Sequence, residues 1–342
     1  MDYNLSKEKF NQLLSELKQE YQIYAPVRKE NKGTYSANDL ITYDLIDNLD
    51  DIELNKKSKY SAKEIVFPIR ETLFHFMDGE QKMASEDEEK YIIFLRPCDR
   101  NAFKRLDKIF LENGPEEDIY YKRLREKVKF FVIECTEGFD SCFCVSMDSN
   151  EVERDDYSAF LRFREDGISF KLNDQELKNN YFTDVNDFEK INFEAQFIQE
   201  NKIKVNLPDK DKITNEVFEN ELWTEYSERC IACGRCNTSC PTCSCFTVKD
   251  VLYDENKKSG ERFRRWAGCH IDGFTEMAGG HSFREEHGDR MRYKTMHKIY
   301  DFAERFDFDM CVGCGRCDDV CPEYISFSKC INKLSQIVEE GA

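Results

Sequence analysis

Apolar residues in the first half of the chain are spaced as in a protein that mixes strands and helices. Residues 5–21 carry apolar side chains at helical spacing, which predicts an amphipathic helix. Tyr91–Leu95 and Val128–Ile133 are short, continuous apolar runs of the kind that form buried strands. A helix-like stretch lies between them and ends before Gly114-Pro115. This order of strand, helix and strand predicts a βαβ unit with two parallel strands.

The rest of the chain contains one predicted hairpin followed by predicted helices. Apolar and polar residues alternate over residues 157–172 on both sides of Asp166-Gly167, a pattern typical of a β-hairpin. Helical spacing returns over residues 215–228 and 289–305. Cys330 lies on a further apolar helical stripe, where packing in a core is the expected role.

A length of 342 residues favours two domains. We place the boundary at the end of a polar, weakly patterned stretch near Pro208. The expected fold class is α+β, with an α/β domain over residues 1–208 that contains a small, partly parallel sheet. Residues 209–342 are expected to form an α-helical ferredoxin domain. This second expectation depends on a long, helix-containing stretch between two cysteine-rich runs, which small β-containing ferredoxins lack.

The two cysteine-rich runs share the spacing C-x2-C-x2-C-x3-C-P. They are CIACGRCNTSCP at Cys230–Pro241 and CVGCGRCDDVCP at Cys311–Pro322. This spacing is typical of proteins that bind the iron of [4Fe-4S] clusters through cysteine thiolates. Short steps between cysteines let one tight turn aim several sulfurs at a single compact object. Glycines inside both runs allow the positive φ angles that such a turn needs.

In proteins with two such clusters, the fourth cysteine of each run binds the cluster of the other run. We therefore assign eight cysteines to two [4Fe-4S] clusters. The first set is Cys230, Cys233, Cys236 and Cys321, and the second set is Cys311, Cys314, Cys317 and Cys240. Zinc would be a strong alternative for one C-x2-C pair, but two complete copies favour iron–sulfur clusters.

Four cysteines in the first half of the chain form a third candidate site. Cys98 and Cys135 each follow one of the two predicted parallel strands, and Cys142 and Cys144 come after a short loop. Open α/β sheets build sites at the carboxyl ends of their strands, so these thiols should meet at one edge. A third [4Fe-4S] cluster is favoured over zinc and over simple burial of the thiols. Asp99 is the expected N-cap of the helix that follows.

Three further cysteines near the first run have no assigned role. Cys243, Cys245 and Cys269 could form another site with His270 or a different ligand. Packing of these thiols around a neighbouring cluster is the favoured alternative.

The 16 cysteines and the net charge of −18 limit the classes of protein to which this chain can belong. The start of the chain, MDYNLSKEKF, lacks the basic and apolar regions of a secretory signal peptide. No apolar run approaches the ~20 residues of a membrane helix. A cysteine-rich cytoplasmic chain is expected to bind metal rather than form disulfides. The acidic charge argues against nucleic acid as a partner, because phosphate contacts need a basic surface.

The sequence lacks the common motifs of substrate chemistry. No G-x-G-x-x-G follows a predicted strand, and neither G-x4-G-K-[ST] nor H-E-x-x-H occurs. No nucleophile with a base and an orienting group can be identified, so we name no catalytic residue. Iron–sulfur motifs without a substrate site predict an electron relay. A cluster-based redox sensor is less favoured, because the sequence contains no visible output domain.

Several stretches together resemble the iron–sulfur electron-transfer subunit of anaerobic sulfite reductase over nearly the full length. They are RPCD at Arg96–Asp99, CFCVSM at Cys142–Met147, CIACGRCNTSCPTCSCFTVKD at Cys230–Asp250, AGGHSFRE at Ala278–Glu285 and CVGCGRCDDVCPEYISFS at Cys311–Ser328. The β subunit of sulfhydrogenase-type nickel–iron hydrogenases is similar in the same places.

The resemblance implies an electron-transfer subunit in a cytoplasmic complex, without nucleic acid or membrane partners. Electrons would pass from an NADH-oxidising flavin subunit, through the [4Fe-4S] clusters of this chain, to a sirohaem subunit that reduces sulfite to hydrogen sulfide. The alternative is the same relay in a nickel–iron hydrogenase.

Overall fold

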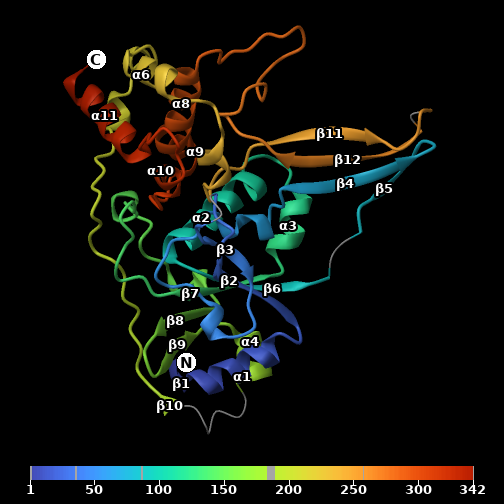
Figure 1. The fold of residues 1–342 in the computed structure, drawn as a ribbon, viewed down its shortest axis with the longest axis vertical. Helices are drawn as coiled ribbons and strands as arrows, with labels where there is room; N and C mark the ends of the chain where they lie inside the picture. The colour runs from blue at the N-terminus through green and yellow to red at the C-terminus, as the bar shows by residue number, and fades with distance from the viewer. Residues whose placement is uncertain (1, 35–36, 86–87, 183–188, 257, 342) are drawn as a thin grey trace.

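The computed structural model describes residues 2–34, 37–85, 88–182, 189–256 and 258–341. Two sheets organise this part of the chain. An eight-stranded sheet forms the body around the N-terminus, and a four-stranded sheet projects from it as an arm (Figure 1). The helices of the C-terminal third lie together at the end of the molecule opposite the N-terminus.

The large sheet is mixed, with parallel strands at its centre. Its strands, in spatial order, are β10 (Glu189–Lys190), β1 (Asp2–Ser6), β9 (Gly167–Leu172), β8 (Ala159–Phe163), β7 (Val128–Ile133), β6 (Lys90–Leu95), β2 (Tyr21–Lys29) and β3 (Leu40–Leu45). Strands β2, β6, β7 and β8 are parallel neighbours, and the remaining pairs are antiparallel. The predicted partly parallel sheet, its βαβ unit and the β8–β9 hairpin are therefore confirmed.

Helices cover both faces of this sheet. They are α1 (Lys7–Leu17) and α4 (Gln175–Tyr181) on one face, and α2 (Pro97–Leu111) and α3 (Ile119–Arg125) on the other. Alternate residues of β6 point to opposite faces, so Ile92 and Phe94 pack toward α1 while Ile93 and Leu95 pack toward α2.

The first predicted helix is shorter than its apolar pattern suggested. Leu5 belongs to β1, where it pairs with Ile168 of β9, and Tyr21 begins β2. Long-range strand pairing therefore takes both ends of the expected helix over 5–21, because a strand can bury the same apolar residues.

The arm is an antiparallel sheet built from two distant hairpins. Its strands, in spatial order, are β11 (Phe246–Leu252), β12 (Ser259–Trp266), β4 (Arg70–Met77) and β5 (Glu80–Met83). The stretch between the two cysteine runs thus contains a β-hairpin, which corrects the expectation of an α-helical domain without β-structure of this kind. Because β12 pairs with β4, strands from both sides of the expected boundary at residue 208 join in one sheet. The boundary itself stays a prediction.

Short helices carry and surround the cysteine runs. They are α5 (Asn215–Phe218), α6 (Leu222–Arg229), α7 (Arg235–Thr238), α8 (His287–Met296), a π-helical turn (His297–Asp301), α9 (Phe302–Phe306), α10 (Arg316–Asp319) and α11 (Phe327–Glu340). Single 3-10 turns occur at Leu49–Asp51, Ala62–Ile65, Val145–Met147, Arg154–Asp156 and Lys210–Lys212. Cys330 of α11 is fully buried in the core, as expected.

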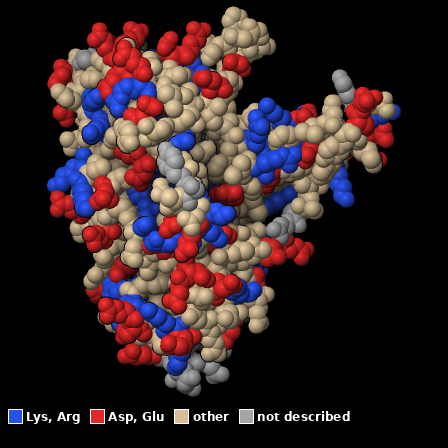
Figure 2. Space-filling model, in the orientation of Figure 1, with Lys and Arg blue, Asp and Glu red and all other residues tan. Residues whose placement is uncertain are grey.

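The surface carries both signs of charge. Figure 2 shows Lys and Arg interspersed with Asp and Glu over one face, so the net negative charge is spread rather than gathered in one place. Among the described residues, no helix combines the length and the apolar character that crossing a bilayer requires.

Candidate metal centres

The structure brings the four cysteines of the first set to one small cavity. Cys230, Cys233 and Cys236 of the first run and Cys321 of the second run all line it. Gly234 is the N-cap of α7 and has a φ of +68°, which lets the chain turn tightly between Cys233 and Cys236. The crossed arrangement, with a cysteine from the opposite run, is the one expected of a two-cluster domain.

The second set is more deeply buried. Cys311 and Cys314 are each 8% exposed, and Cys240 from the first run is an electrostatic neighbour of both. Burial raises the pKa of the Cys311 thiol to about 12, and the nearby thiols add to the rise. Cys317 is also a neighbour of Cys240. Iron would replace these protons, because only the thiolate is a metal ligand.

The four N-terminal cysteines also come together. Cys98 is the second residue of α2 and follows β6 directly, while Cys135 comes after β7. The Cys98 thiol is close enough to interact electrostatically with the thiols of Cys142, Cys144 and Cys314, the last of which belongs to the second set. The Cys135 thiol interacts with Cys142 in the same way. The third set therefore lies at the carboxyl edge of the parallel strands, beside the second.

Close backbone packing joins the second and third sets. Gly315 has a φ of +70°, and a Cβ added there would lie 2.1 Å from the carbonyl oxygen of Ser141. A Cβ on Gly313 would lie 2.5 Å from the carbonyl of Phe143, whose N–H donates to the Gly313 carbonyl at 2.7 Å. Only glycine permits such an approach, so these glycines position one thiol loop against the other.

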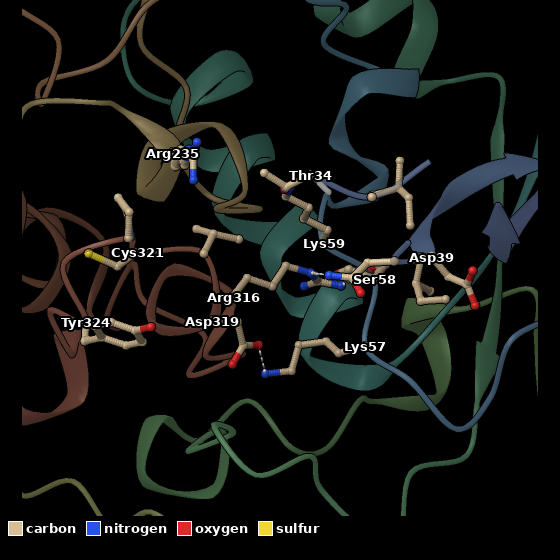
Figure 3. A pocket seen from close by; sticks show the side chains of 16 residues that line it. Thr34, Asp39, Lys57, Ser58, Lys59, Arg235, Arg316, Asp319, Cys321 and Tyr324 are labelled. Atoms are coloured by element: carbon tan, nitrogen blue, oxygen red, sulfur yellow. Dashed lines mark hydrogen bonds and ion pairs between the residues drawn. The ribbon is translucent and has the colours of Figure 1, made fainter. Parts of the chain in front are cut away.

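Asp99 and Arg316 form a buried ion pair between the second run and the N-terminal sheet. The Arg316 guanidinium donates to both Asp99 carboxylate oxygens, at 2.6 and 2.8 Å, and to the carbonyl and hydroxyl of Ser58. Figure 3 shows Arg316 pointing from the second run toward Ser58, next to the Lys57–Asp319 pair. Tyr43 donates its hydroxyl to Asp99 at 3.2 Å.

The expected role of Asp99 as an N-cap was wrong. Helix α2 begins at Pro97 with Arg96 as N-cap, because the fixed φ of proline suits the first helical position. Asp99 is thus already inside the helix, where its carboxylate binds Arg316. The sequence alone does not reveal this pair, although both residues adjoin candidate ligands.

Lys294 of α8 places a buried positive charge between the first two sets. Its side chain lines the cavity of the first set, and the residue is 4% exposed. Although burial acts in the opposite direction, the negative charge of Cys236, Cys317 and other cysteines in their thiolate form raises the pKa of Lys294 well above its ordinary value. The ammonium therefore stays charged beside both sets.

Replacing Lys294 with methionine should lower the reduction potentials of both neighbouring clusters. A positive charge favours the reduced, more negative cluster, and in a buried site its loss is worth on the order of tens of millivolts. Redox titration followed by electron paramagnetic resonance (EPR) measures the shift. Lys329→Met is the control, because Lys329 is exposed on α11. Equal potentials in the two variants would contradict this role for Lys294.

The remaining thiols have different surroundings. Cys330 is a core residue, whereas Cys243, Cys245 and Cys269 lie close to the first two sets. In the described ranges, no three His, Cys, Asp or Glu side chains are grouped as ligands of a single metal ion.

Comparison with known proteins agrees with this geometry. Residues 229–325 match the 4Fe-4S dicluster domain family. Over 346 aligned residues, the chain is 30% identical to sulfhydrogenase 2 subunit beta of Pyrococcus furiosus, and the alignment covers 97% of this chain and 98% of that protein. Both findings identify an electron-transferring iron–sulfur protein that carries a 4Fe-4S dicluster domain. The chain belongs to the family of sulfhydrogenase β subunits.

Proposed function

We propose that this chain is the electron-transfer subunit of a cytoplasmic hydrogenase complex of the sulfhydrogenase type. The observation that carries this proposal is near full-length similarity to a sulfhydrogenase β subunit, including the N-terminal part that lies outside the dicluster domain. The hydrogenase alternative is thereby better supported than the sulfite reductase assignment.

We propose that three clusters serve this role. The first and second sets would each hold a [4Fe-4S] cluster, and Cys98, Cys135, Cys142 and Cys144 would hold a third. The clusters supply one-electron redox chemistry. The chain contributes thiolate ligands, burial that excludes water, and positive charge from Lys294.

The packing of the three sets supports a linear order of electron transfer, with the second set in the middle. The Cys142 sulfur lies 3.8 Å from the Cys314 carbonyl oxygen, which places the third set against the second. Lys294 lies beside thiols of both the second and first sets. Each outer set also reaches the surface: Cys233 is exposed, and Cys135 lines an open pocket with Arg96 and Glu137. Partners would therefore exchange electrons at these two ends.

A relay in anaerobic sulfite reduction is the second candidate. It is favoured by the combined motifs around Cys98, Cys142 and both cysteine runs, which resemble the iron–sulfur subunit of that reductase. The partners would then be a flavin subunit that oxidises NADH and a sirohaem subunit.

Anaerobic affinity purification of the tagged chain from its native host distinguishes the two candidates. Co-purification of a nickel-containing subunit would support the hydrogenase, whereas sirohaem without nickel would move the assignment to sulfite reduction. Iron and sulfide with no partner protein would contradict both and favour a free carrier or a sensor. An untagged extract treated in the same way serves as the control.

A further inference from the structure

Three thiols outside the three proposed sets lie at the base of the β11–β12 hairpin. Cys243 and Cys245 come just before β11, and Cys269 comes just after β12. The hairpin closes this base, because the Ala267 N–H donates to the Cys245 carbonyl at 2.9 Å. As a result, Cys245 and Cys269 are electrostatic neighbours although they are distant in sequence.

A buried amide holds two of these thiols in place. Asn237 of α7 is 2% exposed, and its side-chain nitrogen lies 3.6 Å from the sulfur of Cys243 and 3.3 Å from that of Cys269. Its oxygen accepts the His270 N–H at 3.2 Å, and a Cβ on Gly268 would lie 2.8 Å from this oxygen. Hydrogen bonds to ligand sulfurs are how proteins orient thiolates and tune iron–sulfur clusters.

Two buried ammonium groups face the same thiols. Lys63 donates to the carbonyls of Cys240 and Cys243, at 2.9 and 2.8 Å, and Lys298 donates to the Thr242 hydroxyl at 2.8 Å. The two lysines are close enough to repel each other, and both have Cys243 as a neighbour.

A negatively charged group in this place would match the positive charge of these lysines. In the part of the chain that the structure describes, neither lysine forms an ion pair with a carboxylate. Lys63 lies over the Trp266 ring, 4.2 Å from its centroid, and both lysines have the Cys240 and Cys243 thiols as neighbours. Burying a charge without an opposite charge is costly, and a neutral thiol does not compensate it. A thiolate bound to a metal cluster does.

We propose that Cys243, Cys245 and Cys269 bind a further iron–sulfur cluster beside the first and second sets. Thiolates suit both zinc and iron–sulfur clusters, but a structural zinc site needs four closed ligands. The fourth candidate, His270, faces elsewhere: its Nδ1 lies 3.7 Å from the Cys230 sulfur, in the cavity of the first set. Three thiolates would bind three of the four irons of a [4Fe-4S] cluster. A ligand other than cysteine would bind the fourth iron.

The position of this site gives it contact with both sets of the dicluster domain. Cys269 is a neighbour of Cys236 in the first set, and Cys243 is a neighbour of Cys240 in the second. The additional cluster would therefore exchange electrons with either. This inference rests on the proposed function, since it requires a chain that is loaded with clusters.

Iron and acid-labile sulfide per chain, measured in the anaerobically purified holoprotein, test the proposal. The Cys245→Ser/Cys269→Ser double variant should lose one cluster's content, about four iron and four sulfide. Cys330→Ser is the matched control, because it also alters a buried thiol, and it should keep the wild-type content. EPR should show loss of one signal while the others persist.

Other outcomes overturn the proposal in distinguishable ways. Unchanged iron and sulfide in the double variant would mean that these thiols are not ligands, and loss of zinc alone would assign the site to zinc. Cys245→Ser, at a half-buried position, is the second variant in case the double variant does not fold. It should alter the spectrum of one cluster, and a wild-type spectrum would contradict the site. A wild-type chain without iron would instead refute the proposed function itself.

Discussion

Replacing Cys314 with serine should interrupt electron transfer through this chain while leaving the redox centres of its partner subunits reducible. Cys314 is 8% exposed and belongs to the second set, which lies between the other two. Changing residues that merely support metal ligands costs 10–100-fold, so loss of a ligand should reduce electron flow by roughly two orders of magnitude or more.

Stopped-flow absorbance of the purified complex measures this effect, because reduction of each partner centre can be followed separately. The variant should also lose iron and sulfide equivalent to one cluster. Cys330→Ser provides the control, since its buried thiol packs in the core rather than facing another set. Normal electron flow in Cys314→Ser would exclude the second set from the relay.

Replacing Asp99 with alanine should destabilise the protein by about 3–5 kcal/mol, the range for removing one partner of a buried ion pair. The side chains of Asp99 and Arg316 are 3% and 4% exposed, so Arg316 would keep a buried charge without its carboxylate. The carboxylate is also the reason that the pKa of Arg316 stays well above its ordinary value despite burial. In the variant, the Arg316 guanidinium cannot reduce this cost by releasing its proton near neutral pH.

Anaerobic urea unfolding compares this variant with Asp250→Ala. Asp250 pairs with Arg262 on the exposed side of the arm, where losing an ion pair costs about 1 kcal/mol or less. A similar loss of stability in both variants would contradict the structural role of Asp99. Because Arg316 lies inside the second run, Asp99→Ala should also make that run's cluster easier to lose.

Local patterns account for the parts of the fold that sequence analysis predicted. The apolar runs of β6 and β7 are continuous because both faces of these strands are covered by helices. The cysteine runs could also be recognised from local sequence, because their spacing reflects the shape of a single cluster. Long-range pairing explains what was missed. Strand β12 is rich in charged residues, and its pairing with β4 joins segments from opposite halves of the chain.

The same difference between local patterns and long-range contacts applies to the candidate sites. Each set of thiols could be grouped from spacing and strand order, but the buried charges around them could not. Asp99 and Arg316 are 217 residues apart in sequence. Lys63, Lys294 and Lys298 look like ordinary surface lysines, and only the fold shows that all three are buried among thiols. Single-sequence patterns do not contain the distances that decide such pairs.

The iron and sulfide content of the anaerobically purified chain, combined with EPR of its reduced form, tests directly whether this chain carries iron–sulfur clusters. We expect iron and acid-labile sulfide in equal amounts, at no less than two [4Fe-4S] clusters per chain, with magnetic coupling between neighbouring clusters. Zinc in place of iron, or iron without sulfide, would contradict this expectation.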